Sequence, residues 1–395
     1  MRESREWKFL DEFFRECWKP VSTEYPWQWA DKNRILTTVS SGEPGPYRTD
    51  RTPFLREIAE SLASKVIDPM SGQWMLNPTK CVVLMKGSQL GGTDLLLNWH
   101  GSNMILDPGP DMIIHPTVDN AKRFSKQKLK TMIVNTPCLD ALIKDSRARD
   151  SGNEIMIKEY PGGFLALGGS NSPAGLRGIS IKRISCDDFD GFAPDAGGEG
   201  SPEDLIANRQ STFSDSMLFL NSTPTDKGFS NIERAYDQTD QRKFFLPCVN
   251  CGEFEPLAWA QIKWPEGDPL KAYCECLHCG FHLQNFHKNT MLLKGVWRTT
   301  AEPKLPGWVG YHLSGLYSPH GWESWGEIAV KFLKAKGVPE KLRVWINTKL
   351  AETFEDKDGE VIESSGMLER REDYKLDLLP DGVAVLVASI DVQDD

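Results

Sequence analysis

The chain has 395 residues, of which 39% are hydrophobic and 26% are charged, so it can build two or three folded domains and is not a disordered protein. Its 46 Lys and Arg residues against 56 Asp and Glu residues give a formal net charge of −10, which excludes a uniformly basic coat for nucleic acid. Any contact with DNA must therefore come from a local basic surface.

No run of 18 apolar residues is present, and residues 1–16 mix charged residues with isolated apolar ones. We therefore expect neither a membrane-spanning segment nor a signal peptide, and we place the protein in a reducing cytoplasm. There the nine cysteines serve as free thiols or metal ligands rather than as disulfides.

Apolar periodicity predicts helices over Glu6–Trp18 and Phe54–Ile67 near the N-terminus. From about residue 80, short apolar runs that are typical of buried strands alternate with helical patterns, which predicts a parallel sheet with crossover helices. The runs are Cys81–Met85, Met112–Ile114, one ending at Cys186, and Met217–Leu220, and the helices are Asp94–Trp99 and Val118–Thr131. The second of these helices carries five basic residues, which either contact a DNA backbone or form a solvated face. Later, Trp322–Lys336 has the pattern of an amphipathic helix and Val383–Ile390 that of a buried strand.

A glycine-rich segment between a predicted strand and a predicted helix has the context of a phosphate-binding loop. When Thr93 is aligned with the last residue of G-x-x-x-x-G-K-[ST], Gly92 takes the lysine position and Lys86 takes that of the first glycine. We predict that Lys86 reaches back to the β- and γ-phosphates of ATP and that Thr93 binds Mg²⁺. The alternative is a glycine-rich turn without a nucleotide. The backbone amides predicted to cradle the phosphates are those of Gly87, Ser88, Gln89, Leu90, Gly91 and Gly92.

Two further motifs follow strands in the order that an ATPase requires. Asp187 and Asp188 end one strand, and we predict that Asp187 holds Mg²⁺ through water while Asp188 orients or deprotonates the attacking water. Ser222 and Thr223 follow the next strand and are predicted to sense the γ-phosphate. The alternatives are an exposed acidic loop and a plain strand-to-turn signal.

Four cysteines form two pairs, Cys248-x-x-Cys251 and Cys276-x-x-Cys279, that are 24 residues apart, and each pair precedes a glycine. This spacing predicts a zinc ribbon with four thiolates around a structural Zn²⁺ and no open coordination position for catalysis. The alternative is four reduced thiols in a buried core. Cys274 and His278 are expected to stay outside the cluster.

In this order the motifs resemble the large subunit of phage DNA-packaging terminases of the lambda-like GpA type. The resemblance covers about residues 25–395. It implies an α/β fold of the P-loop (RecA/ASCE-like) class, with a parallel sheet flanked by helices, a zinc-ribbon insertion and the first strand of an RNase H-like nuclease. Further segments that carry it are Gln28–Asp31, Thr52–Arg56, Glu199–Pro202, Tyr317–Pro319, Asn347–Thr348 and Glu352–Thr353.

The resemblance implies an ATP-driven motor that translocates double-stranded DNA into a procapsid, with ATP, Mg²⁺ and Zn²⁺ as cofactors. It also implies a small terminase subunit and a portal protein as partners, a homo-oligomeric ring on the portal, and a location in the cytoplasm of the infected host. Arg177 is either a finger that completes a neighbouring subunit's site or a surface arginine that contacts DNA. The family usually has Glu at the position of Asp188, which is one methylene shorter.

Asp391 matches the first metal-binding aspartate of the family's nuclease, and the chain ends four residues later. Because two-metal cleavage needs several carboxylates, we expect no DNA cutting from this chain alone. The predicted domains are a lead-in region 1–65, an ATPase core 66–240, a zinc-ribbon insertion 241–300, a helical part 301–378 and the nuclease start 379–395.

Two other functions compete with the motor. A helicase-like translocase needs a second RecA-like domain, for which residues 300–375 are too short and too helical. A zinc-ribbon adaptor without hydrolysis follows if Gly92 and Asp188 mark a degenerate nucleotide site.

Overall fold

The computed structural model describes residues 24–39, 41–143, 154–172, 178–193, 195 and 202–355. The predicted helix Glu6–Trp18, Arg177, the predicted strand Val383–Ile390 and Asp391 lie outside these residues. All the elements that follow belong to one unit that ends at Phe354.

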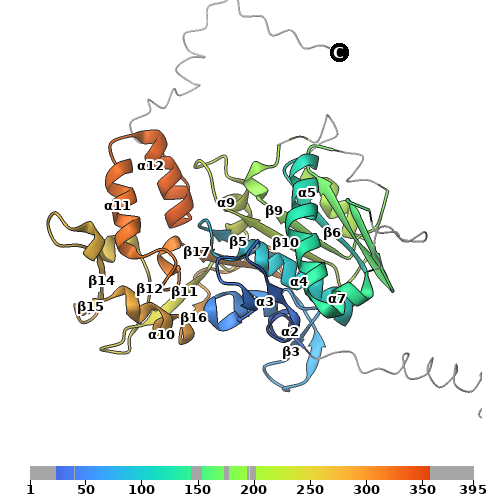
Figure 1. The fold of residues 1–395 in the computed structure, drawn as a ribbon, viewed down its shortest axis with the longest axis horizontal. Helices are drawn as coiled ribbons and strands as arrows, with labels where there is room; N and C mark the ends of the chain where they lie inside the picture. The colour runs from blue at the N-terminus through green and yellow to red at the C-terminus, as the bar shows by residue number, and fades with distance from the viewer. Residues whose placement is uncertain are drawn as a thin grey trace, which may run out of the picture. The chain divides into compact units, whose positions relative to one another are not determined.

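A ten-stranded sheet organises this unit, in the order β12-β11-β17-β5-β10-β9-β6-β8-β7, with β16 pairing with β11 (Figure 1). Neighbouring strands from β11 to β8 run parallel, whereas β7, β12 and β16 are antiparallel at the edges. The predicted parallel sheet is therefore confirmed. The strands are β5 Cys81–Lys86, β6 Pro110–His115, β7 Ile157–Tyr160, β8 Gly163–Gly169, β9 Arg183–Asp187, β10 Met217–Ser222, β11 Arg242–Pro247, β12 Phe254–Pro256, β16 Val296–Arg298 and β17 Trp308–Leu313.

Helices cover both faces of the sheet, and the side-chain alternation of β5 shows how. Val82 and Leu84 pack into one apolar cluster with Trp99 of α4, while Val83 packs into a second cluster with Ile232 of α9. Every residue of β5 is buried, as expected for a parallel strand covered on both faces. The helices of this part are α2 Pro26–Asn33, α3 Leu55–Ser61, α4 Gly92–Leu106, α5 Val118–Phe124, α6 Lys130–Asn135, α7 Pro137–Leu142, α8 Pro202–Gln210 and α9 Asn231–Tyr236.

Two of the predicted helices differ from the structure. The helix expected over Phe54–Ile67 ends at Ser61, and Lys65–Ile67 is instead a strand, β3, that pairs with β4, Trp74–Leu76. The β-branched residues Val66 and Ile67 favour a strand. The strand with which they pair, β4, follows the predicted helix in the chain, so the apolar pattern of the helix does not reveal it. The helix expected over Val118–Thr131 forms, but a π-helical turn at Ser125–Leu129 separates α5 from α6.

The segment between β10 and β17 is only partly separate from the main sheet, because β11, β12 and β16 join that sheet. The remainder contains a three-stranded sheet and helix α10, and we call residues 248–295 the cysteine module. Its elements are β13 Ile262–Lys263, β14 Tyr273–Glu275, β15 His282–Leu283 and α10 Lys288–Leu293.

After β17 the chain forms α11 Trp325–Ala335, α12 Pro339–Trp345 and a π-helical turn, η9, Ile346–Leu350. Figure 1 shows α11 and α12 on the opposite side of the sheet's centre from α5 and α7. Ser324 caps α11 by accepting from the amide of Glu327, whose carboxylate accepts from the amide of Ser324. This cap starts the helix three residues later than its apolar pattern does. Among the helices that the structure describes, none combines the length and the apolar character needed to cross a membrane.

Candidate nucleotide site

Three of the predicted motifs meet at the carboxyl ends of neighbouring strands. Strand β10 lies between β5, which leads into the glycine-rich loop, and β9, which ends at Asp187. The register pairs Asn221 with Asp187 on one side, and Ser222 with Met85 on the other. The carboxyl edge of a parallel sheet is where such folds bind their ligands, so the three motifs share one candidate site.

The loop Lys86–Thr93 is held by its neighbours and leads into the N-terminus of α4. The amides of Gly87 and Ser88 donate to the carbonyl oxygens of Leu313 (2.8 Å) and Thr348 (2.9 Å). These two amides already have acceptors and are not free to bind a phosphate. Of the six amides predicted to bind the phosphates, those of residues 89 to 92 remain. Gly91 has a φ of +84°, which turns the chain into the 15-residue helix α4, whose N-terminus favours an anion.

The side chain of Lys86 fills the space above Gly92. A Cβ atom added at Gly92 would lie 2.2 Å from Cε of Lys86 and 2.6 Å from Oδ1 of Asn221. Lys86 is buried, and its ammonium group lies 3.5 Å from the carbonyl oxygen of Gly87. Burial lowers the pKa of Lys86, although the charges of Asp187 and Asp188 oppose the shift. The ammonium therefore enters the loop from its start, through the volume that a side chain at residue 92 would need.

Asp187 and Thr93, the two predicted Mg²⁺ ligands, lie side by side. The hydroxyl of Thr93 donates to Oδ2 of Asp187 (3.4 Å), and Nδ2 of Asn221 donates to Oδ1 (2.6 Å). Burial raises the pKa of the Asp187 carboxyl, and the Lys86 charge opposes it. Asp188 is exposed over part of its side chain, with its carboxyl partly buried beside Asp187, and has a left-handed backbone conformation with a φ of 57°. Burial of its carboxyl and the neighbouring Asp187 both raise the pKa of Asp188.

The hydroxyl of Ser222 links the Ser222–Thr223 pair, which we call the coupling motif, to the loop that follows the two acids. It accepts from the amide of Asp190 (3.0 Å) and donates to the carbonyl oxygen of Thr223 (3.0 Å). The carboxylate of Asp190 accepts from the amide of Ile232 (2.6 Å) and the hydroxyl of Thr225 (2.7 Å). Asp190 thus has a structural role, and Ser222 is hydrogen-bonded to the loop that follows the two acids.

Two residues at this edge were missed by the sequence analysis. Oδ1 of Asn221 and Nε2 of His115 are buried and have no hydrogen-bond partner among the described residues. His115 closes β6, the neighbour of β9, and burial lowers the pKa of its imidazole to about 4. Both are polar residues at the end of an apolar strand. The same pattern identified Asp187 in the sequence, so it could also have identified these two residues.

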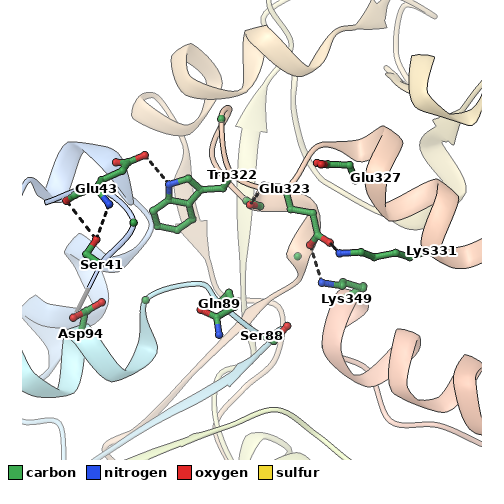
Figure 2. A pocket seen from close by; sticks show the side chains of 15 residues that line it. Ser41, Glu43, Ser88, Gln89, Asp94, Trp322, Glu323, Glu327, Lys331 and Lys349 are labelled. Carbon is green, nitrogen blue, oxygen red and sulfur yellow. Dashed lines mark hydrogen bonds and ion pairs between the residues drawn. The ribbon is translucent and has the colours of Figure 1, made fainter. Parts of the chain in front are cut away.

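A cavity of about 740 Å³ opens beside the loop, lined by Ser88, Gln89 and Gly91 (Figure 2). Thr93, Asp187 and Asp188 lie outside its lining. Because β17 and β10 flank β5 on opposite sides, the cavity lies on the β17 side of the loop and the carboxylates on the β10 side. Its volume is in the range of small-molecule sites. Other lining residues are Ser41, Glu43, Asp94, Trp322, Glu323, Glu327, Lys331 and Lys349.

A second cavity of about 370 Å³ adjoins the first and shares Glu43, Asp94 and Trp322 with it. Tyr47 and Arg48 line this second space. The indole N–H of Trp322 donates to the carboxylate of Glu43 (2.8 Å), which bridges the border between the two cavities.

Comparison with known proteins gives the family. The family described as "Phage terminase large subunit gpA, ATPase domain" matches residues 41–297, and "Terminase large subunit gpA, endonuclease domain" matches residues 308–395. The chain belongs to the phage terminase large subunit gpA family. The first match spans the loop, both acids, the coupling motif and the four paired cysteines, and the second begins in β17 of the central sheet.

Two curated gpA-family relatives cover nearly the whole chain. The terminase large subunits of Escherichia phage lambda and Enterobacteria phage P21 are 28% and 26% identical over 392 and 390 residues, 93% of this chain in each case. The chain spans 58% of the length of each relative. Among solved structures, the large terminase ATPase domain of Thermus phage P74-26 aligns with a TM-score of 0.40 and 12% identity, over 70% of this chain and 89% of that one.

In this gpA-family chain the four paired cysteines converge. Their Sγ atoms all lie within 4.8 Å of one another, with Cys248–Cys279 and Cys251–Cys276 each at 3.8 Å. The two knuckles match, because Gly252 and Gly280 have φ values of +78° and +68°, and their amides donate to the backbone carbonyl oxygens of Cys248 and Cys276. Cys274 is buried outside the cluster, and His278 is half-exposed beside Glu255.

Proposed function

We propose that this chain is the ATPase motor part of a gpA terminase, which hydrolyses ATP to translocate double-stranded DNA into a procapsid. The observation that carries the proposal is the path of Lys86 through the space above Gly92, beside Asp187 and Thr93. The lysine is displaced in sequence and still enters the loop, which supports a working nucleotide site over a degenerate one. A helicase-like translocase is less well supported, because the described residues contain a single large sheet.

The residues present fit a magnesium nucleotide. Lys86 would hold the β- and γ-phosphates, and Thr93 with Asp187 would hold Mg²⁺, which neutralises phosphate charge when bound. Asp188 would orient the attacking water and accept its proton. Ser222 and Thr223 would pass the loss of the γ-phosphate to the loop that carries the acids. The unpartnered Oδ1 of Asn221 supports this fit, because a buried polar atom without a partner is expected where a ligand completes the site.

We also propose that the four paired cysteines bind a structural Zn²⁺. A tetrahedral site with Zn–S bonds of about 2.3 Å has sulfur-to-sulfur distances of about 3.8 Å, which agrees with the two shortest pairs. With four thiolates the metal has no open position, so the site would hold the cysteine module in shape. Zinc analysis of the purified chain should give one equivalent, and Cys251→Ser should lose it.

The remaining partners stay proposals from the family. They are a small terminase subunit, a portal protein and a homo-oligomeric ring in the infected cell, with Arg177 either completing a neighbour's site or contacting DNA. Asp391 lies in the stretch that matches the endonuclease domain.

The test is ATP hydrolysis with and without long duplex DNA, in the original chain and in Lys86→Ala and Asp188→Asn. We expect DNA-stimulated turnover that both substitutions abolish, with ATP binding lost only in Lys86→Ala. Lys336→Ala, an exposed lysine after α11, serves as the control and should behave as the original chain. Turnover that survives both substitutions, or no ATP binding at all, would refute the assignment.

A further inference from the structure

We infer that Lys288 is a positioning residue for the nucleotide, because it holds the segment Ser318–Glu323 as the wall of the larger cavity that faces the nucleoside. Lys288 lies in the cysteine module, on α10, outside the predicted phosphate site. The inference rests on the proposed function, since it concerns the same nucleotide. It adds that a residue of the cysteine module determines how tightly the nucleoside part of the nucleotide binds.

The orientation of the nucleotide follows from the two sides of the loop. Mg²⁺ and the terminal phosphates belong with Thr93 and Asp187, on the β10 side of β5. The cavity lies on the β17 side, beyond Ser88 and Gln89. A triphosphate that spans the loop therefore directs its ribose and base into the cavity, against the wall formed by Ser318, Gly321, Trp322 and Glu323.

Lys288 holds this wall by its backbone. The side chain is fully buried, and its ammonium group donates to the carbonyl oxygens of Ser318 (3.0 Å) and Glu323 (3.3 Å), at the two ends of the segment. The same ammonium lies 4.7 Å from the ring centroid of Trp325. Burying an ammonium group is unfavourable unless its hydrogen bonds are made. Here they are made to the backbone of the cavity wall.

Two neighbours of Lys288 hold the middle of the segment. The amide of His320 donates to Oδ1 of Asn289 (3.1 Å), and Nδ1 of its ring lies 3.0 Å from Nδ2 of Asn285. Asn285 and Asn289 follow the second cysteine knuckle by a few residues. The end of the cysteine module thus contacts the wall at three points: both ends through Lys288 and the middle through the two asparagines.

On the cavity side, the wall contacts Glu43 across the cavity and the lysines that line the cavity beside the phosphate loop. Trp322 donates to Glu43 (2.8 Å), and the carboxylate of Glu323 lies between Lys331 and Lys349 (Figure 2). Lys349 follows Thr348, whose carbonyl oxygen accepts from the amide of Ser88 in the phosphate loop. Without Lys288 the wall would keep these side-chain contacts but lose the hydrogen bonds to its backbone at Ser318 and Glu323. The loop itself keeps its bonds to β17 and η9.

Because Lys288 contacts the wall and not the phosphate loop, its loss should weaken the binding of some ligands and not of others. Ligands that use only the phosphate loop should be insensitive to Lys288, and ligands that also use the wall should be sensitive. Inorganic tripolyphosphate and ATP form such a pair, because they share the phosphates and differ in the nucleoside.

The experiment measures dissociation constants of ATP and of tripolyphosphate, both with Mg²⁺, for the full chain and for Lys288→Met. Lys294→Met, an exposed lysine that follows α10, is the matched control. We expect ATP binding to weaken about tenfold in Lys288→Met, with tripolyphosphate binding and Lys294→Met close to the original chain. Asn289→Ala, at an exposed position, should weaken ATP binding about threefold without affecting the fold.

Equal ATP affinity in Lys288→Met and Lys294→Met would overturn the inference, and so would an equal weakening of ATP and tripolyphosphate. If Lys288→Met does not fold, Asn289→Ala decides, and an unchanged ATP affinity there overturns it. Failure of the original chain to bind either ligand refutes the nucleotide site itself and this inference with it. Binding of both ligands by the original chain, without selectivity in the variants, refutes only the role of Lys288.

Discussion

Near the amino ends of β6 and β9 buried charges are paired, whereas at the carboxyl ends of β6 and β10 two buried polar side chains each have an atom without a hydrogen-bond partner among the described residues. Arg183, at the start of β9, donates to Asp111 (2.7 Å) and Asp107 (2.7 Å). His100 uses both ring nitrogens, toward Asp111 (3.0 Å) and Ser185 (2.9 Å). The carboxylate of Asp107 also pairs with Lys182 (2.9 Å).

At the carboxyl edge of the sheet, His115 closes β6 with an unpartnered Nε2, and Asn221 of β10, beside Asp187, has an unpartnered Oδ1. An unsatisfied buried polar group costs about 1–3 kcal/mol, so a ligand that supplied partners to these atoms would recover that cost. The paired cluster indicates architecture. Burial of charge alone does not distinguish a functional site from a structural one.

The largest effect should come from breaking the paired end. Arg183→Met would leave Asp107 and Asp111 without their main partner, and we expect a loss of about 3–5 kcal/mol in the free energy of unfolding. Urea unfolding measures this, with Arg123→Met on the exposed face of α5 as the control. Equal stability of the two variants would mean that the paired end is not structural.

The unpaired end should respond in binding and not in stability. Lys86→Met is expected to weaken ATP binding about a hundredfold, near 2.7 kcal/mol. The free energy of unfolding of the nucleotide-free chain should not fall, because burial already disfavours the Lys86 ammonium and lowers its pKa. Calorimetric titration and urea unfolding of the same variant give both numbers. A large stability loss with retained binding would reverse our assignment of the two ends.

The smallest effect is a pH dependence carried by His115. Its pKa is about 4 in the folded chain, against about 6.5 in an unfolded one. Between pH 6.5 and pH 4 the imidazole is protonated in the unfolded chain but neutral in the folded chain. The free energy of unfolding is therefore unaffected by His115 above pH 6.5 and falls as the pH is lowered toward 4.

His115→Gln should remove on the order of 2 kcal/mol of this acid-induced loss of stability. The measurement compares the free energies of unfolding of the two chains at pH 7 and pH 4.5. Parallel curves would show that His115 does not titrate between these pH values.

The sequence predicted those parts of the site in which a local pattern carries the chemistry. The apolar run before Lys86 and the acids after the run at Cys186 both predicted strand ends that the structure brings together. The cavity wall was not predicted, because its position depends on β17 pairing with β5, more than 220 residues apart in the chain. Lys288 gave no signal, since a lysine in a short helix is ordinarily a solvated residue.

The helix expected over Phe54–Ile67 shows the opposite failure. Its apolar spacing fits a helix, but β3 takes the last residues because β4 offers a partner that periodicity does not record. Local propensity was overridden there by pairing.

The shared volume above Gly92 also bears on how this loop could have arisen. Side chains at residues 86 and 92 would reach into one space, so a lysine at residue 92 would displace the end of the side chain that Lys86 places there. Single substitutions from either arrangement give a loop with two crowded ammonium groups or with none. The two forms of the loop are therefore separated by a coupled pair of changes.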